Sequence, residues 1–400
     1  MSRGSTALVV LALAGVVELV TLSVAEQPIG QTTNAVQAQR SDTRHALPLS
    51  PFYDTSNPLP AGRPGELIRA EPFDEYALPY DVSAVRFLYH SRAATGEDVA
   101  SSGVILVPDG KPPAGGWPII AWAHRFSGVA RTCAPSLMRN LYVGPFLSMY
   151  VGLGYAVVAT DYAGLGTNSR NAFLDLRSNA MDVIYSVTAA RAAVPQLDSR
   201  WIAMGESQGG VAVVGVAEMQ SEIRDPNYLG AIAISGVADI KDIYEALAQE
   251  HSRGLPLFLA YGIKTVYPRF QVSNMLTAKA LSLYEGVERQ CGVSDSSSEV
   301  SATEMLKTNW ENEPFVKQFF SVNTLGQKPA YGPLLVIDAE GPEVPITLTA
   351  RVVARMCKQG DRIQFYKYPE SSSLLGDSVA DQITWIQSRF AGRRAPSNCP

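Results

Sequence analysis

The hydrophobic pattern of the chain predicts short buried strands that alternate with amphipathic helices. Continuous apolar runs, which are typical of buried strands, lie at 102–108, 117–123, 155–160, 229–235 and 333–338. Between the third and fourth of these runs, apolar residues recur at the spacing of a helix: Leu176, Ala180, Val183, Ile184 and Val187. Strands at 86–91 and 362–367 and helices at 347–358 and 379–390 complete the predicted order. This alternation predicts an α/β fold with a mostly parallel central sheet and helices on both faces.

One long segment breaks the alternation. From Ile240 to Tyr331 the pattern predicts several helices and no core strand. Because roughly 90 residues are too many for a simple connection, we expect 241–330 to form an inserted helical cap or lid over the C-terminal ends of the strands. The core is then formed by 51–240 and 331–400. Six apolar residues of the cap either line an acyl pocket or form the cap's own core: Leu255, Leu257, Phe258, Leu259, Phe319 and Phe320.

The N-terminus has the three parts of a secretory signal peptide. Arg3 precedes an apolar segment from Ala7 to Val20, and Ser23-Val24-Ala25 follows it. This predicts that residues 1–25 are removed by cleavage after Ala25 and that the protein is secreted, either extracellular or periplasmic. An uncleaved anchor is the alternative, because the apolar stretch is only slightly shorter than a membrane span. Residues 26–50 are polar and rich in Gln, Thr and Ala, which predicts a flexible leader.

Charge and cysteine content narrow the classes of partner. The 400-residue chain has a net charge of −5 and a pI near 5.5, which argues against a nucleic-acid partner. An exported protein can keep disulfides, and the four cysteines allow three pairings between which their spacing does not choose. Their spacing is not that of a metal site, so no metal is expected.

The candidate chemistry lies at residues 205–209, where the pattern G-x-S-x-G occurs as Gly205-Glu206-Ser207-Gln208-Gly209. An apolar run precedes it and small residues typical of a helix follow, which is the strand-turn-helix context of a nucleophile elbow. We therefore expect Ser207 to act as the nucleophile in acyl transfer. The backbone N–H groups of Gln208 and of Arg125 or Phe126, after the strand at 117–123, are expected to form the oxyanion hole.

Two ionisable residues beside this motif are expected to have other roles. His124 follows the strand at 117–123 directly and is expected to be a structural histidine at a strand end. Glu206 precedes the serine, and the side chain at that position usually packs or faces solvent rather than reacting.

Several short motifs accompany the elbow. They are Pro51-Phe52-Tyr53, Ala123-His124, Cys133-Ala134-Pro135-Ser136, Thr160-Asp161-Tyr162-Ala163-Gly164-Leu165-Gly166-Thr167, Gly205-Glu206-Ser207-Gln208-Gly209-Gly210, Val344-Pro345, Arg389-Phe390-Ala391-Gly392-Arg393 and Pro396-Ser397-Asn398-Cys399. With these motifs, residues 50 to 400 resemble the secretory lipase family of α/β-hydrolases, which includes the fungal lipase A type.

The resemblance implies an α/β-hydrolase fold with an inserted helical lid and no cofactor. It also implies a secreted hydrolase that acts on triacylglycerol or other acyl esters, with lipid or small-ester substrates and transient contact with a lipid interface. It implies the disulfides Cys133–Cys291 and Cys357–Cys399.

The acid of the expected catalytic triad is altered. In this fold the acid follows the late strand near Ile337, within G-x-x-D just before Val-Pro. Here that position falls on Gly341 or Pro342, depending on where a one-residue gap is placed. Four nearby or equivalent acids could substitute: Asp338, Glu340, Glu343 and Asp239.

The base of the triad is altered as well. The histidine should follow Tyr368-Pro369, but the sequence places Ser373 at that position. No realignment restores it, because no histidine follows His251. A serine hydroxyl is a poor nucleophile without a base.

Three explanations remain open. The chain is a catalytically silent relative that binds lipid or acyl ligands, or an enzyme with a displaced base, for which His124 and His251 are the only histidine candidates. Alternatively, it is an ordinary family member whose triad positions have been replaced. Removing a triad member costs about 10⁴- to 10⁶-fold in turnover. The leading hypothesis is an ester hydrolase that forms an acyl-enzyme on Ser207, and the silent relative is the alternative.

Overall fold

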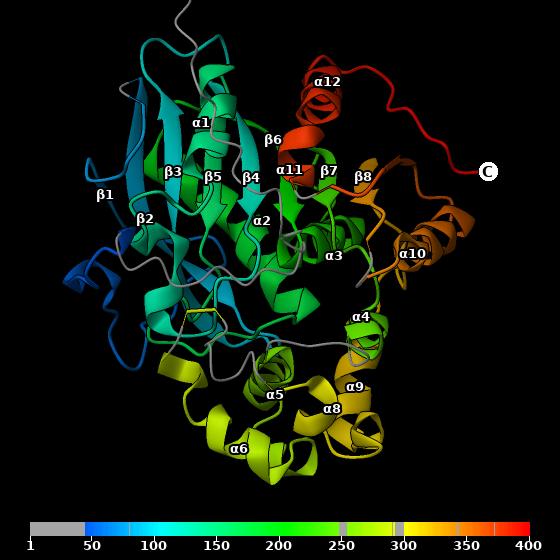
Figure 1. The fold of residues 1–400 in the computed structure, drawn as a ribbon. Coiled ribbons are helices and arrows are strands. Elements are labelled where there is room, and N and C mark those ends of the chain that lie inside the picture. The colour runs from blue at the N-terminus through cyan, green and yellow to red at the C-terminus, as the bar shows by residue number, and fades with distance from the viewer. Residues whose placement is uncertain are drawn as a thin grey trace, which may run out of the picture. The chain divides into compact units, whose positions relative to one another are not determined.

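A nine-stranded sheet organises the molecule (Figure 1). The computed structural model describes residues 45–79, 81–247, 254–289, 291–292, 300–341, 344–371 and 373–400. The strands are β1 Leu67–Pro72, β2 Val82–Arg92, β3 Asp98–Pro108, β4 Trp117–Ala123, β5 Ala156–Thr160, β6 Leu197–Glu206, β7 Tyr228–Ile234, β8 Leu334–Ala339 and β9 Ile363–Tyr368. Their order is β1-β2-β3-β5-β4-β6-β7-β8-β9. The pairs β1/β2, β2/β3 and β3/β5 are antiparallel, and every pair from β5 onward in this order is parallel. This confirms the predicted mostly parallel sheet.

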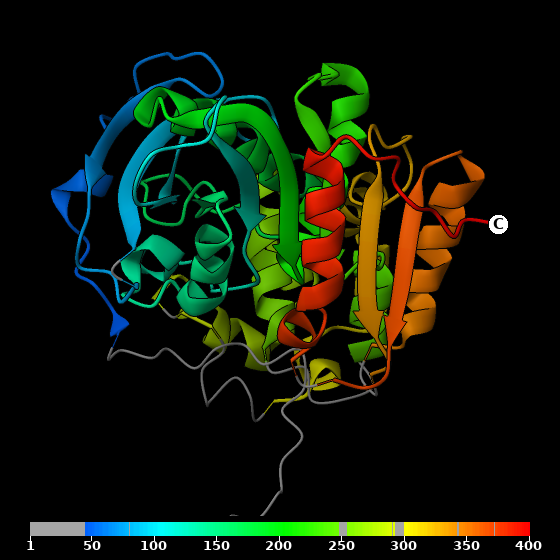
Figure 2. The ribbon, with the colours of Figure 1, turned by 90° about the horizontal axis from the view of Figure 1, so that it is seen from above.

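Helices lie on both faces of this sheet (Figures 1 and 2). They are α1 Gly144–Gly152, α2 Leu176–Ala193, α3 Gln208–Ile223, α4 Ile240–Leu247, α5 Leu255–Val266, α6 Ala278–Tyr284, α8 Ala302–Met305, α9 Pro314–Val322, α10 Ile346–Lys358, α11 Leu374–Asp377 and α12 Val379–Phe390. Short 3₁₀ helices occupy Pro51–Tyr53, Arg131–Cys133, Pro135–Leu137, Val272–Asn274, Val287–Arg289 and Trp310–Asn312. Residues of α1 and α12 share a hydrophobic cluster with one face of the sheet, and those of α2, α3 and α10 share one with the other face.

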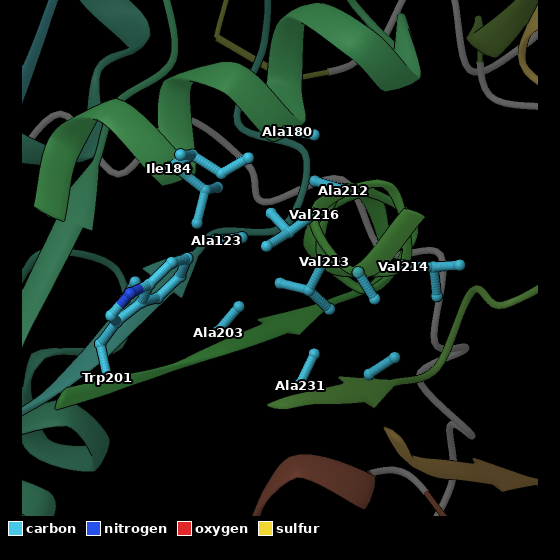
Figure 3. Packing of buried hydrophobic residues seen from close by; sticks show 14 of the residues in the cluster. Ala123, Ala180, Ile184, Trp201, Ala203, Ala212, Val213, Val214, Val216 and Ala231 are labelled. Atoms are coloured by element: carbon cyan, nitrogen blue, oxygen red, sulfur yellow. The ribbon is translucent and has the colours of Figure 1, made fainter. Parts of the chain in front are cut away.

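The side-chain sizes on the two faces of β6 and β7 decide how closely α3 packs. Toward α3 the strands present Ala203 and Ala231, which lie under Val213 and Val216 of that helix (Figure 3). Neighbouring strand residues point to the opposite face, where larger side chains pack against α12. Small residues on the α3 side therefore let this helix lie close to the sheet.

The N-terminal part of the chain is only partly described. The predicted signal peptide, residues 1–25, lies outside the described residues, and so do residues 26–44 of the predicted leader. The Leu47 amide donates to the Leu137 carbonyl at 2.7 Å, the Arg139 amide donates to the His45 carbonyl at 2.7 Å, and Leu47 is buried. Residues 45–47 of the predicted flexible leader are therefore paired with the core. Of the helices that the structure describes, none combines the length and apolarity needed to cross a membrane.

Three of the sequence motifs meet around one buried carboxylate. Asp161 accepts hydrogen bonds from the Ser102 hydroxyl at 2.6 Å, the Ser136 hydroxyl at 2.5 Å and the Ser136 amide at 2.9 Å. The Tyr53 hydroxyl lies 2.8 Å from that of Ser136. The motifs 51–53, 133–136 and 160–167 thus supply one hydrogen-bonded network of the core, and their role is structural.

The C-terminal motif covers the edge of the sheet at β9. The Asn398 side chain accepts from the Phe365 amide at 2.8 Å and donates to the Phe365 carbonyl at 2.8 Å. The Asn398 amide also donates to the Ile363 carbonyl at 3.0 Å. These bonds satisfy backbone groups that an edge strand would otherwise expose for pairing with another chain.

Two disulfides join distant parts of the sequence. Cys133–Cys291 links the segment after β4 to the helical segment between β7 and β8, across 158 residues. Cys357–Cys399 links α10 to the C-terminal motif across 42 residues. These are the two pairs that the resemblance implies. In the chain-entropy model, closing loops of such lengths destabilises the unfolded chain by about 4 to 5 kcal/mol per disulfide.

The helices α4 to α9, between β7 and β8 in the sequence, gather below the sheet in Figure 1. Their apolar residues form a hydrophobic cluster that also includes Val129, Ala172 and Phe173 of the loops after β4 and β5. Five of the six apolar residues singled out above are buried in this cluster: Leu257, Phe258, Leu259, Phe319 and Phe320. Leu255 packs against it. The structure therefore favours the interpretation that these residues form the cap's own core over the interpretation that they line an acyl pocket.

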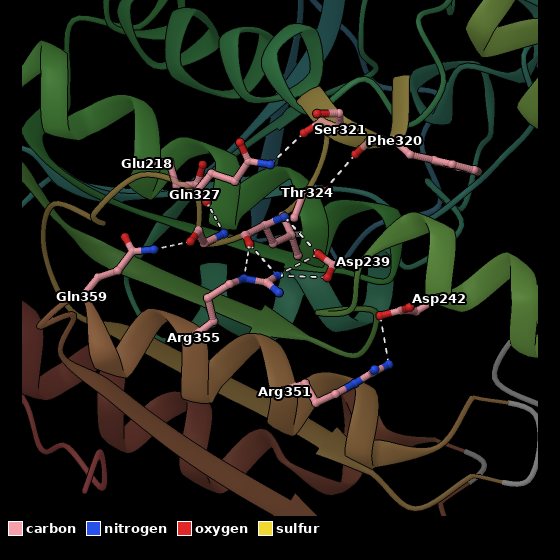
Figure 4. Close-up of polar contacts among 12 residues, drawn as sticks. Glu218, Asp239, Asp242, Phe320, Ser321, Thr324, Gln327, Arg351, Arg355 and Gln359 are labelled. Atoms are coloured by element: carbon pink, nitrogen blue, oxygen red, sulfur yellow. Dashed lines mark hydrogen bonds and ion pairs between the residues drawn. The ribbon is translucent and has the colours of Figure 1, made fainter. Parts of the chain in front are cut away.

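A single arginine holds both ends of this helical segment (Figure 4). Arg355 of α10 donates to both carboxylate oxygens of Asp239, before α4, at 2.8 and 3.0 Å. Its guanidinium also donates to the Leu325 carbonyl, after α9, at 2.6 and 2.9 Å. The Leu325 amide in turn donates to Asp239 at 3.2 Å, which closes a ring of hydrogen bonds. Arg351 makes a simpler ion pair with Asp242 at 2.9 Å.

We expect Arg355→Gln to loosen the helical segment without unfolding the core, because it removes several charge-assisted hydrogen bonds at both stems. The expected loss in stability is about 1–2 kcal/mol. Hydrogen–deuterium exchange should increase in α4 and α9 and stay unchanged in β4 and β6. The matched control is Arg351→Gln, which breaks one exposed ion pair and should change exchange little. Equal exchange in the two variants would contradict the conclusion that Arg355 holds both ends of the helical segment.

Buried carboxyl groups make the fold sensitive to pH. Burial raises the pKa of Asp161 and Asp175 to about 6 and that of Asp182 and Glu218 to about 7, although hydrogen bonds to each carboxylate partly offset this. The folded state therefore binds protons more tightly than the unfolded chain. The resulting stabilisation is fully present below about pH 4 and is lost as the pH rises through 6 to 7.

Asp182→Asn tests this dependence. One carboxylate oxygen of Asp182 accepts from the Ala163 amide at 2.9 Å, and the other has no hydrogen-bond partner among the described residues. The amide side chain keeps the first bond and removes the charge. We expect the variant to be more stable than wild type at pH 8, by an amount on the order of 1 to 3 kcal/mol, and much closer to it at pH 5. Melting temperatures at both pH values measure this, and a difference that does not change with pH would contradict it.

Candidate active site

The chain reverses sharply at Ser207, between the end of β6 and the start of α3. Ser207 has φ 55° and ψ −114°, a conformation that residues other than glycine rarely adopt. A Cβ atom at Gly205 would lie 2.3 Å from the Gly209 carbonyl oxygen, and one at Gly209 would lie 1.9 Å from the Ala123 carbonyl oxygen. The two glycines of G-x-S-x-G are therefore required because the backbone segments touch.

The groups around Ser207 are suited to stabilise the negative charge that develops on the carbonyl oxygen of an attacked acyl group. Ser207 is half-buried, its amide donates to the Ile234 carbonyl at 2.9 Å, and its hydroxyl makes no hydrogen bond with a described residue. The amide of Gln208 belongs to the first turn of α3, where helical N–H groups have no acceptor within the helix. The positive end of the helix dipole adds to their field.

The loop after β4 lies beside the elbow because β4 and β6 are adjacent parallel strands. Ala123 pairs with Gly205 in the sheet, which places His124 and Arg125 next to the elbow. The His124 carbonyl accepts from the Tyr162 hydroxyl at 3.1 Å, which fixes this part of the loop.

Both nitrogens of the His124 ring lie against backbone carbonyl oxygens. Its Nδ1 lies 2.6 Å from the Arg125 carbonyl oxygen and its Nε2 lies 3.1 Å from that of Asp161. Burial lowers the pKa of His124 to about 4, so the ring is neutral near pH 7 and donates from one nitrogen only. His124 therefore has the arrangement of a structural histidine, and its geometry does not support the displaced-base hypothesis.

An ion pair that the motifs do not predict lies directly beside Ser207. The Arg125 guanidinium lies 3.7 Å from the Glu206 carboxylate, and their side chains are 26% and 13% exposed. The prediction that Glu206 only packs or faces solvent therefore misses its charge partner. The sequence does place Arg125 and Glu206, which have opposite charges, just after two predicted strands. It does not show that these strands are neighbours, because the pairing of β4 with β6 is a property of the tertiary structure.

The residue at the base position lies on the surface. Ser373 is exposed, precedes α11, and its amide donates to the Ser371 hydroxyl at 3.1 Å. Among the described histidines, His90 is paired with Asp98 at 3.0 Å and His124 is held as above. His251 lies outside the described residues.

Two of the candidate acids are bound to other groups. Asp338 accepts from the Thr349 hydroxyl and, at 2.9 Å, from the Ala339 amide, while burial raises the pKa of its carboxyl. Asp239 belongs to the Arg355 ring of hydrogen bonds. As substitute acids they would have to orient a base in addition to making these bonds.

Of the remaining acid candidates, Glu340 is exposed. Gly341, half-buried, offers no side chain, and Pro342 and Glu343 lie outside the described residues.

Aromatic contacts tie the loop after β4 to the helical segment. The Phe126 ring lies 4.7 Å from that of Phe258 in α5 and 4.9 Å from that of Phe173. The loop that carries Arg125 is therefore in contact with the sheet on one side and with α5 on the other. In the part of the chain that the structure describes, no group of three or more His, Cys, Asp or Glu side chains could hold a metal ion.

Solved structures share this architecture. Lipase A of Candida antarctica in its closed state superimposes with a TM-score of 0.75 at 20% identity, over 88% of this chain and 89% of that one. The rice cell wall degrading esterase LipA of Xanthomonas oryzae superimposes with a TM-score of 0.69 at 16% identity, over 83% of this chain and 100% of that one. These similarities confirm the predicted α/β-hydrolase fold. No curated protein matches the chain.

The sequence itself carries the family relationship. The model of the family described as secretory lipase matches residues 142–398, more than half of the chain. This match includes the elbow, the helical segment, and the altered acid and base positions. The chain belongs to the secretory lipase family.

Proposed function

We propose that this protein is a secreted ester hydrolase that accepts the acyl group of a lipid or smaller ester on Ser207. The observation that carries the proposal is the strained backbone of Ser207 at the N-terminus of α3. Such strain persists only where the surrounding structure enforces it, and here it places Ser207 at the N-terminus of α3, whose free amides can stabilise an oxyanion. Family membership and the lipase and esterase folds that the chain resembles support the same chemistry.

In the proposed reaction, Ser207 Oγ attacks the ester carbonyl carbon and its proton is released. The Gln208 amide, together with an amide of the Arg125–Phe126 loop, stabilises the oxyanion. The intermediate then expels the alcohol, which takes up a proton, and water hydrolyses the acyl-enzyme. With Ser373 at the base position, water must accept the Ser207 proton. Turnover is then expected to be about 10⁴- to 10⁶-fold below that of a complete triad.

The wider features of the protein fit this proposal. Residues 1–25 are proposed to direct secretion, and residues 241–330 to form a cap over the C-terminal ends of the strands, in transient contact with a lipid interface. Both disulfides fit an oxidising compartment. No cofactor is needed for the proposed acyl transfer.

A catalytically silent relative that binds lipid or acyl ligands is the second candidate. The exposed position of Ser373 and the bound state of Asp338 and Asp239 favour it. In that case fatty acids stabilise the protein against heat, and Ser207→Ala leaves this stabilisation unchanged.

A fluorophosphonate probe distinguishes the two candidates, because it phosphonylates a serine that acts as a nucleophile. Since Ser373 stands at the base position, labelling is expected to be slow, and it is followed with excess probe over a long incubation. The hydrolase proposal predicts covalent labelling at Ser207, identified by peptide mass spectrometry, and its loss in Ser207→Ala. Wild-type protein with a cooperative melting transition that stays unlabelled, beside a labelled control hydrolase, would exclude the proposal.

Rebuilding the triad provides a second test. A Cβ placed at Gly341 has only one described atom within 4 Å, the Val344 carbonyl oxygen at 3.5 Å, so the described backbone leaves room for a side chain to begin there. We expect Gly341→Asp combined with Ser373→His to raise kcat/KM for p-nitrophenyl butyrate by about 10²- to 10⁴-fold. Adding Ser207→Ala to this variant should abolish the gain. Pro342→Asp combined with Ser373→His covers the other alignment of the acid position, and the absence of any gain in both folded double variants would contradict the proposed acyl transfer.

A further inference from the structure

The ion pair between Arg125 and Glu206 links the two backbone segments proposed to bind the oxyanion. Glu206 is the last residue of β6 and directly precedes Ser207, while Arg125 lies two residues beyond the end of β4. The register Ala123 to Gly205 brings the two ends together, and the charged groups approach to 3.7 Å.

This arrangement is unfavourable for stability by itself. The second oxygen of the Glu206 carboxylate is buried and has no hydrogen-bond partner among the described residues. Burial raises the pKa of the Glu206 carboxyl, and the Arg125 charge only partly offsets it. A neutral side chain of similar size would avoid this desolvation. A buried, incompletely bonded charge next to a nucleophile is typical of a functional residue.

The contacts of the residues on either side of Arg125 explain why an additional contact is needed to hold this loop against the elbow. On one side the His124 carbonyl is fixed by the Tyr162 hydroxyl at 3.1 Å. On the other side the Phe126 ring packs against that of Phe258 in α5, so the loop is in direct contact with the helical segment. The guanidinium of Arg125 reaches back to the elbow between these two anchors.

We infer that Glu206 is a positioning residue, which holds the Arg125 loop against the elbow so that its amides and that of Gln208 face one point. This inference rests on the proposed function of Ser207. A displacement of even 1 Å at such donors can cost about 10²-fold in rate, so the Arg125–Glu206 contact acts on reactivity while the carboxylate lowers stability.

The test compares four purified full-length variants with wild type. They are Glu206→Gln, Arg125→Met, the double variant, and Arg139→Gln as a matched control. The control breaks the exposed Arg139–Glu75 ion pair of 3.1 Å. Three quantities are measured: the rate constant of fluorophosphonate labelling, the melting temperature at pH 8, and hydrogen–deuterium exchange of peptides covering 124–128.

We expect Glu206→Gln to label about tenfold more slowly while its melting temperature is unchanged or higher. A residue needed only for folding would instead lower the melting temperature. Arg125→Met should slow labelling to the same extent, and the double variant should be no slower than either single variant. Exchange of 124–128 should increase in all three, and Arg139→Gln should match wild type throughout.

The outcomes separate this inference from the proposed function. If wild type is not labelled, the proposed function fails, and the exchange data alone decide whether Glu206 holds the loop. Unchanged exchange at 124–128 in Glu206→Gln overturns the inference in either case. Additive labelling losses in the double variant also overturn it, since they would mean that the two side chains act separately.

Discussion

The close contact between the first turn of α3 and the end of β4 is the constraint on which the rest of this structure depends. A methyl group at Gly209 would lie 1.9 Å from the Ala123 carbonyl oxygen, so the two backbones touch. This contact forces Ser207 into its positive-φ conformation at the top of β6. It also requires small residues on the sheet under α3, which Ala203 and Ala231 supply. The elbow is therefore a consequence of helix and sheet packing, and it is retained as long as the core is intact.

The dependence of the elbow on packing explains why the chain keeps the backbone donors of the oxyanion hole while the acid and base side chains of the triad are replaced. The oxyanion donors are backbone amides, and the fold places them whatever side chains follow. The acid and base are single side chains on loops after β8 and β9, and one substitution removes each without disturbing the sheet. Ser373 stands at the base position on the surface, and Gly341 or Pro342 stands at the acid position. A change of an exposed side chain such as that of Ser373 has little effect on stability. A chain can thus keep a complete elbow while its proton-transfer groups change.

Most of the motifs outside the elbow serve the scaffold. Tyr53, Ser136 and Asp161 come from three motifs and form one buried network. Asn398 bonds to both backbone groups of Phe365 and closes the edge of the sheet. Similarity in these motifs therefore reports the fold more directly than the activity. The charged residues beside Ser207 have no such explanation, which is why the Arg125–Glu206 pair is the more informative feature for function.

Local sequence determined the order and type of the core elements. The strands at 117–123 and 229–235 and the helix at 379–390 were predictable because buried parallel strands are continuous apolar runs and helices repeat every 3.6 residues. The chemistry of G-x-S-x-G was predictable because its glycines report a steric contact. The edge strand β1 was not predicted, since none of its six residues is buried and they carry no apolar run.

Only the tertiary structure decided which side chains meet. It placed Arg125 beside Glu206 and bonded Asp239 to Arg355, which anchors the helical segment. It also placed the His124 ring against backbone carbonyl groups, an arrangement that does not support a role as base. It also showed that the apolar residues of that segment pack on one another. The physical reason is that these contacts join residues far apart in the chain, and the order of strands in the sheet, rather than any local pattern, sets their distances.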